Sequence, residues 1–117
     1  MSGFGPYLRQ RREARRADDP RFSLRQVAER VGVQPSYLSK VERDEVGPPS
    51  EDTIRRLADE LDEDVDVLLA LAGKVSTDLK DVIRRRPRLF AQVIRELRDA
   101  PEAAVLRVVR EVRDGDW

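Results

Sequence analysis

The side chains best suited to chemistry in this sequence are hydrogen-bond donors that cluster between residues 34 and 43. They are Gln34, Ser36, Tyr37, Ser39, Lys40 and Arg43. Amide, hydroxyl and cationic groups donate readily to the acceptor edges of bases and to phosphate oxygens. Tyr37, Leu38 and Val41 have the spacing of an apolar helix stripe, and Pro35 suits the first turn of that helix. The pattern therefore predicts a short helix with a donor-bearing outer face.

A second short helix is predicted directly before this one, from Ser23 to Val31. Ser23 and Gln26 have the spacing of a capping box, which satisfies free amide groups at a helix start. The apolar positions recur at helical spacing and are Leu24, Val27, Ala28 and Val31. Gly32 suits the left-handed conformation that often ends a helix. The two helices are thus joined by a tight turn, and the second is suited to enter a DNA major groove.

This segment resembles the helix-turn-helix of the lambda-repressor-like regulators of Cro/cI type, the xenobiotic-response-element family. The matching residues are Ser23, Val27, Ala28, Gly32, Val33, Leu38, Ser39, Val41 and Glu42. The wider likeness runs from about Phe4 to Gly73. It implies an all-α fold, with a five-helix lambda-repressor-like DNA-binding domain and a C-terminal helical extension. The alternative is an ordinary helical bundle in which the turn at Gly32 has no such meaning.

Position on the predicted helices suggests a role for each polar side chain. The residues expected to contact bases are Gln34, Ser36, Tyr37 and Lys40, although Tyr37 fits the core equally well. The residues expected to contact phosphates are Ser23, Arg25, Ser39 and Arg43. The resemblance further implies that Arg12 of the first helix forms a structural ion pair with Glu42. The alternative is that Glu42 is an exposed helix residue of little energetic weight.

Two domains are predicted, residues 1–74 for DNA binding and residues 75–117 as the helical extension. Within the first, Ser50 is expected to cap a fourth helix. Asp64 or Asp66 is expected to start a fifth helix that buries Val67, Leu68 and Leu71. The extension carries more apolar residues than a small helix pair can hide, so we expect it to form a dimer. Its expected dimer contacts are Leu89, Phe90, Val93, Ile94, Leu97, Val105, Leu106, Val109 and Val112. Folding back onto the first domain is the alternative.

Composition excludes several functional classes. The 117 residues include no Cys and no His, which removes thiol catalysis, disulfides, zinc fingers and imidazole chemistry. The acidic run between residues 59 and 66 is interpreted as a solvated helix end rather than a magnesium site. We therefore expect no enzyme activity, no cofactor and no metal. No apolar run approaches the roughly 18 residues that span a membrane, and no signal peptide is evident, so a cytoplasmic protein is expected.

The formal net charge is zero, but its distribution is uneven. Residues 1–49 carry ten Lys or Arg against seven Asp or Glu. Residues 50–73 carry two against eight, and residues 74–117 carry eleven against eight. Affinity for DNA depends on the local positive charge that faces phosphates, so the basic first segment is compatible with DNA binding.

Several residues depart from the pattern of the family. Arg11 stands where an apolar residue usually faces the core, and the connection from residue 16 to residue 21 is longer than usual. Asp44 replaces a common Gly after the third helix. Asp62 and Glu63 stand where a Gly and an apolar residue are frequent.

These observations predict a sequence-specific, DNA-binding transcriptional regulator. It is expected to act as a homodimeric repressor on a palindromic operator in double-stranded DNA. The resemblance implies operons of phage, plasmid or stress-response type, sometimes with a toxin or protease as partner protein. The alternative is an antitoxin or adaptor that acts mainly by binding a partner protein through its C-terminal helices.

Overall fold

Helices account for all of the regular structure in residues 3–117, the part of the chain that the computed structural model describes. The first five α-helices are α1 (Phe4–Arg16), α2 (Leu24–Val31), α3 (Pro35–Glu42), α4 (Glu51–Leu61) and α5 (Val65–Leu71), with a 3₁₀ turn η1 (Pro20–Phe22) after α1. The last three are α6 (Thr77–Arg85), α7 (Pro87–Leu97) and α8 (Glu102–Asp114). The predicted all-α fold is confirmed. The chain divides into two units, Met1–Thr77 and Asp78–Trp117, which are described separately below.

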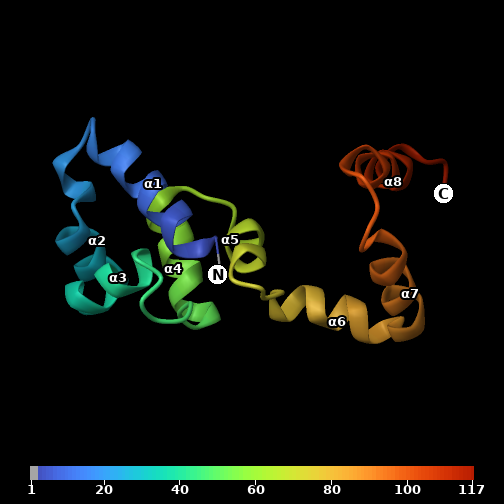
Figure 1. Cartoon of the computed structure of the whole chain (residues 1–117), viewed down its shortest axis with the longest axis horizontal. Helices are drawn as coiled ribbons and strands as arrows, with labels where there is room; N and C mark the ends of the chain where they lie inside the picture. The colour runs from blue at the N-terminus through green and yellow to red at the C-terminus, as the bar shows by residue number, and fades with distance from the viewer. Residues whose placement is uncertain (1–2) are drawn as a thin grey trace. The chain divides into compact units, whose positions relative to one another are not determined.

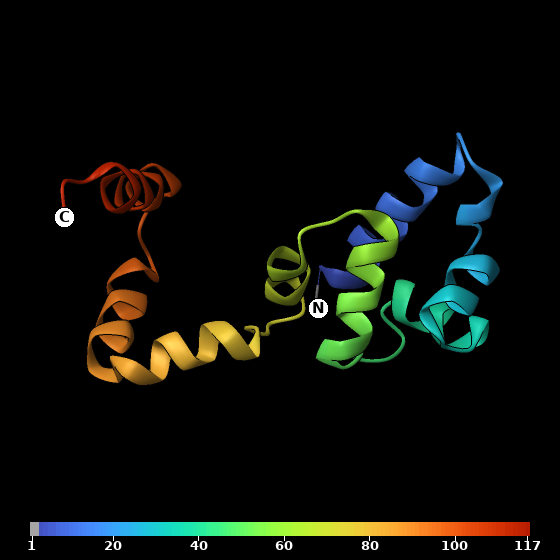
Figure 2. The same cartoon turned by 180° about the vertical axis from the view of Figure 1, so that it is seen from behind.

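The N-terminal unit is built around α4, with α2 and α3 on one side and α5 on the other (Figures 1 and 2). All five helices contribute to one buried apolar cluster. Its members are Phe4, Leu8, Val27, Ala28, Val31, Leu38, Val41, Ile54, Leu57, Ala58, Leu61, Leu68 and Leu69. Such a core is formed by the apolar stripes that the sequence spacing predicts, because residues three or four apart share one helix face.

Side-chain caps fix where α2 and α4 begin. The Ser23 hydroxyl accepts a hydrogen bond from the Gln26 amide at 3.3 Å, and Ser50 caps α4 in the same way. The predicted capping box at Ser23 forms only in this half. The other half would need the backbone N–H of Ser23 to donate to the Gln26 side chain, but this N–H donates to the Pro20 carbonyl and closes η1. The Gln26 side chain itself donates to the same carbonyl, at 3.5 Å.

The start of α5 determines which of its apolar residues reach the core. The Asp64 carboxylate accepts hydrogen bonds from the backbone of Asp66 and Val67, which sets the rotation of this short helix. Leu68 and Leu69 are then fully buried, whereas Val67 is 48% exposed. The prediction that Val67 is buried is therefore wrong, since it lies on the outer side of α5.

Two departures from the family pattern compensate each other. Arg11 on α1 donates from Nε to Glu63 at 3.0 Å, so the residues at two usually apolar positions form an ion pair. The Tyr7 hydroxyl donates to the same carboxylate at 2.8 Å, which raises the pKa of Tyr7. A polar cluster at the surface thus joins α1 to the connection between α4 and α5.

Two aspartates take the conformation that glycine usually provides. Asp44 follows α3 with φ of 56°, and Asp62 follows α4 with φ of 51°. Both values lie in the left-handed region, which Asp tolerates better than most residues because its side chain can bond locally. The two helices therefore end where the family pattern ends them.

The N-terminal unit continues past the end of α5, up to Thr77. Lys74 donates from Nζ to the Pro49 carbonyl at 2.9 Å, and Ser76 is buried. The Thr77 hydroxyl donates to Glu51 at 3.3 Å. Hydrogen bonds from Arg55 and Thr77 lower the pKa of Glu51. These contacts connect the start of α6 to the start of α4, and the N-terminal unit accordingly ends at Thr77.

The C-terminal unit consists of most of α6 together with α7 and α8. Each of these helices carries apolar and charged residues at helical spacing. Every residue from 78 to 117 is at least partly exposed, so this unit has no buried core of its own.

Gly5 marks a close approach of α1 to the end of α3. A Cβ atom at this position would collide with the Val41 carbonyl oxygen. It would also lie 2.6 Å from the Asp44 Oδ1 and 3.0 Å from the Glu42 carbonyl oxygen. Two of these three atoms belong to the backbone of α3 and cannot move aside without displacing that helix.

We expect Gly5→Ala to lower the free energy of unfolding by about 1–3 kcal/mol, as overpacking in a close-packed core does. Chemical denaturation of the purified variant measures this loss. Gly47→Ala is the matched control, because nothing lies within 4 Å of a Cβ built there. Equal stability of the two variants would show that α1 does not constrain α3 at this point.

Candidate nucleic-acid interface

The turn between α2 and α3 is closed by backbone hydrogen bonds. The N–H groups of Gly32 and Val33 both donate to the Ala28 carbonyl, at 2.9 and 3.0 Å. Gly32 has φ of 85°, a value that favours glycine. Ala28 is fully buried between the helices, where its small side chain permits close packing. This turn fixes the direction in which α3 leaves α2.

The outer face of α3 carries most of the residues predicted to contact bases. Leu38 and Val41 are buried, whereas Gln34, Ser36 and Lys40 are exposed. Tyr37 is only partly buried and packs against the core. Its ring therefore supports α3 from one side, and its hydroxyl is the only part of it that suits a polar contact.

The residues predicted to contact phosphates differ in how free they are. Arg25 is exposed at the start of α2, and Ser23 beside it is partly buried as the cap. Ser39 is partly buried, and its carbonyl accepts a hydrogen bond from Arg43 Nε at 3.3 Å. Arg43 is exposed and also pairs with Glu45 at 2.9 Å. Within the part of the chain that the structure describes, Arg25 has no ion-pair partner that it would have to release in order to bind a phosphate.

Arg12 and Glu42 lie together, as the resemblance implies, and both side chains are only 3% exposed. Arg12 donates from Nε to one carboxylate oxygen of Glu42 at 2.8 Å and from Nη2 to the other at 2.9 Å. Its Nη1 donates to the Phe22 carbonyl at 3.1 Å. The hydrogen bond to Glu42 raises the pKa of Arg12, against the opposite effect of burial, so the guanidinium stays charged.

This bidentate pair ties three elements together. It joins α1 to the last residue of α3, and the bond to Phe22 adds the end of η1. Removing one partner of a buried ion pair leaves an uncompensated charge, which is strongly destabilising. The pair also neutralises a carboxylate that would otherwise repel phosphates beside α3.

Most of the other positive side chains of the N-terminal unit form ion pairs, so a neighbouring carboxylate offsets their contribution to the surface potential. Arg11 pairs with Glu63 at 3.0 Å and Arg30 with Glu60 at 2.7 Å, so part of the acidic run is already engaged. Further pairs among the described residues of this unit join Arg12 to Glu13, Arg15 to Asp62, Arg16 to Glu13, Arg21 to Asp19, Arg55 to Glu51 and Arg56 to Asp52.

Among residues 3–77, three exposed Lys or Arg side chains have no ion-pair partner. Within residues 3–117, no carboxylate oxygen lies within 4.0 Å of the charged nitrogens of Arg9, Arg25 or Lys40. They stand on α1, α2 and α3 respectively. The free positive charge of the described residues of this unit therefore lies on the two helices of the helix-turn-helix, α2 and α3, and on α1, which packs against α3.

No helix within residues 3–117 is long and apolar enough to cross a membrane. No group of three or more acidic side chains among these residues is arranged to hold a metal ion.

Residues 4–71, well over half of the chain, match the family model for a helix-turn-helix domain. The chain belongs to this helix-turn-helix family. Comparisons with curated proteins and with solved structures gave no match. The matched range covers α1 to α5 and thus both helices of the motif. The chain is accordingly a DNA-binding helix-turn-helix protein, and DNA is the partner that the family supports.

Sequence reasoning did not single out Arg9 of this helix-turn-helix domain. The residue lies three positions before Arg12, so both fall on one face of α1. Since Arg12 is expected to contact α3, the three-residue spacing indicates that Arg9 lies on the same side of α1, near α3. The structure adds that Arg9 is exposed and unpaired, which the sequence cannot reveal.

We expect Arg12→Met or Glu42→Gln alone to lower the free energy of unfolding by about 3–5 kcal/mol, because each leaves a buried charge without its partner. The double variant should lose much less than the sum of the two. Denaturant titration of all four proteins gives this coupling energy.

The exposed pair of Arg56 and Asp52 is the control. It has a distance of 2.7 Å, but both side chains are more than half exposed. The corresponding cycle with Arg56→Met and Asp52→Asn should show a coupling below about 1 kcal/mol. Small, additive losses at Arg12 and Glu42 would contradict a structural role for the buried pair.

Proposed function

We propose that this protein is a sequence-specific transcriptional regulator of the lambda-repressor-like, Cro/cI type. It represses by binding a palindromic operator as a homodimer and blocking access to a promoter. The proposed base recognition rests on the outer face of α3, where Gln34, Ser36 and Lys40 are exposed. Arg25 on α2 and Arg9 on α1 are exposed too, and neither has an ion-pair partner among residues 3–117.

In this proposal α3 lies in the major groove with its first two turns against the base edges. Lys40 donates to guanine and Gln34 to adenine, while Ser36 accepts or donates at either. Tyr37 contacts a thymine methyl group with its ring or a phosphate with its hydroxyl. Arg25, Ser23, Ser39 and Arg43 contact phosphates on either side and fix the register of α3 without reading sequence.

Lys40→Ala should relax the preference at one base pair and weaken specific binding, because a good base contact is worth about 1–3 kcal/mol. The measurement is selection of bound sites from random DNA by the wild-type protein and by the variant. Lys80→Ala is the control, since Lys80 is an exposed lysine of the C-terminal unit. An equal loss of affinity for all sequences would make Lys40 a phosphate contact and contradict its assignment to a base.

The dimer part of the proposal rests on the apolar residues of the C-terminal unit. Leu89 and Ile94 are each 60% exposed, and Val112 is 63% exposed. Between α7 and α8, Val93, Leu97 and Val108 line an open, mostly apolar cavity of about 270 Å³. Of the other predicted contacts, Leu106 and Val109 are exposed, and Phe90 and Val105 are partly buried. Exposed apolar faces of this extent mark an interaction site, because water contact with them is unfavourable.

A second copy of the chain is the occupant that suits DNA binding best. One helix-turn-helix neutralises few phosphates, so its own affinity is modest at physiological salt. Joining two copies makes the second binding event intramolecular and raises the apparent affinity. A two-fold symmetric dimer then matches a palindrome whose half-sites are separated by about one helical turn, roughly 34–36 Å.

A chain of residues 1–77 should stay folded, because the buried core of α1 to α5 lies within it. It should sediment as a monomer and bind the selected operator much more weakly than the full chain. Analytical ultracentrifugation and DNA titration measure the two effects. A dimer of residues 1–77 would place the interface within the N-terminal unit and contradict the proposal.

A point variant tests the same surface in the full chain. Ile94→Asp puts a charge on an exposed apolar residue of α7 and should shift the protein to the monomer. Val67→Asp is the matched control, because Val67 is an exposed apolar residue on α5. Monomers from both variants, or from neither, would not fit an interface on the C-terminal helices.

The second candidate function is that of an antitoxin or adaptor. The same exposed apolar faces favour it, since a toxin or protease can cover them as well as a second copy can. In that case the full chain sediments as a monomer when pure and forms a stoichiometric complex with its partner. Ile94→Asp then abolishes this complex and leaves DNA binding unchanged.

A further inference from the structure

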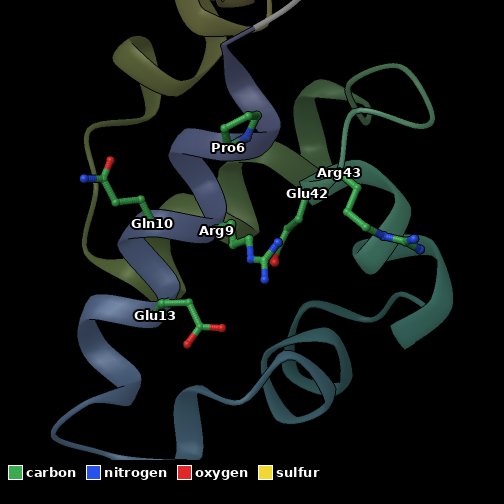
Figure 3. Close-up of a pocket in the computed structure, with 6 residues that line it drawn as sticks. All are labelled: Pro6, Arg9, Gln10, Glu13, Glu42 and Arg43. Carbon is green, nitrogen blue, oxygen red and sulfur yellow. The ribbon is translucent and has the colours of Figure 1, made fainter.

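An open cavity of about 490 Å³ lies where the outer face of α1 meets the end of α3 (Figure 3). Its lining residues are Pro6, Arg9, Gln10, Glu13, Glu42 and Arg43. In Figure 3 the Arg9 side chain extends toward the part of the cavity where Glu42 lies, whereas Gln10 points away from it. Arg43 stands on the α3 side, and in this view its guanidinium is turned away from Arg9. The cavity therefore has an arginine on each of its two walls.

The charges around this cavity cancel except for one. Glu42 is fully engaged by Arg12, which donates to both of its carboxylate oxygens. Glu13 accepts from Arg12 Nη2 at 3.2 Å and lies 3.8 Å from Arg16 Nη1. Arg43 is balanced by Glu45 at 2.9 Å. Arg9 has no carboxylate partner among residues 3–117, so the local excess of positive charge resides on its guanidinium.

We propose that this cavity receives a backbone phosphate of the bound DNA, held by Arg9 with Arg43 on the opposite wall. The inference rests on the proposed function and extends the DNA-binding surface from the helix-turn-helix onto α1. A guanidinium binds phosphate oxygens through several N–H donors at once, which suits Arg9 to this role.

The composition of the cavity favours DNA over a free anion. A small anion would meet the carboxylates of Glu13 and Glu42, which Arg12 and Arg16 balance, and the guanidinium of Arg43, which Glu45 balances. Its net attraction to the cavity is therefore that of Arg9 alone. A phosphate that belongs to DNA is already positioned by α3 and needs only this added attraction. The contact should therefore strengthen binding without reading sequence, because phosphates carry no base information.

The test is the salt dependence of binding to the operator that the wild-type full chain selects from random DNA. Arg9→Gln should reduce the slope of log K against log salt concentration by about 0.9, the contribution of one phosphate contact. The affinities of variant and wild type should converge as salt rises. Arg9→Lys should restore most of the slope, and the selected sequence should be the same for all three proteins.

Arg56→Gln is the control, because it removes an exposed arginine of α4 that is paired with Asp52. Its slope should equal that of the wild type. An unchanged slope for Arg9→Gln would overturn this inference alone, and so would a changed preference at one base pair, which would make Arg9 a base contact. A wild-type protein that selects no DNA sequence would overturn the proposed function together with it.

Discussion

The position of α3 is fixed by α1 at one end and by α2 at the other. At the carboxyl end, the buried fork between Arg12 and Glu42 and the close approach of Gly5 hold α3 against α1. At the amino end, the turn at Gly32 sets its direction. A buried ion pair is seldom the most stable choice for a core, but its geometry admits few alternatives. A helix that contacts base edges needs such a defined position, because its side chains recognise bases only if the surrounding residues hold them in the correct geometry.

The second consequence of this arrangement is electrostatic. A chain with zero net charge binds a polyanion only if its charges are sorted in space. Here acidic residues at the end of α4 and just after it engage arginines of α1 and α2, as Glu63 does with Arg11 and Glu60 with Arg30. Among residues 3–117, Arg9, Arg25 and Lys40 on α1, α2 and α3 are left without a carboxylate partner. The acidic run thus affects the surface potential by pairing with cations other than these three.

Local patterns in the sequence were sufficient to predict the helices of the N-terminal unit and the outward face of α3. Their spacing, caps and left-handed turn residues are all short-range features. Ion pairs between residues far apart in the sequence could not be predicted in this way. Arg11 and Glu63 each depart from the family pattern, and only the fold brings Arg11 Nε within 3.0 Å of the Glu63 carboxylate. Val67 was misjudged because α5 has only seven residues, too few for periodicity to distinguish three adjacent apolar positions. Arg9 was hidden among several arginines of α1, since ion pairing decides which of them is free.

The C-terminal helices place a thermodynamic condition on the proposed regulator. A segment of 40 residues without one buried side chain gains little from hydrophobic burial to offset its conformational entropy. If a second copy covers Leu89, Ile94 and Val112, folding of this segment and dimerisation become one equilibrium, and both depend on protein concentration. Operator occupancy then rises more steeply with concentration than one-to-one binding would allow. Repression would thus respond to the amount of protein through the C-terminal helices.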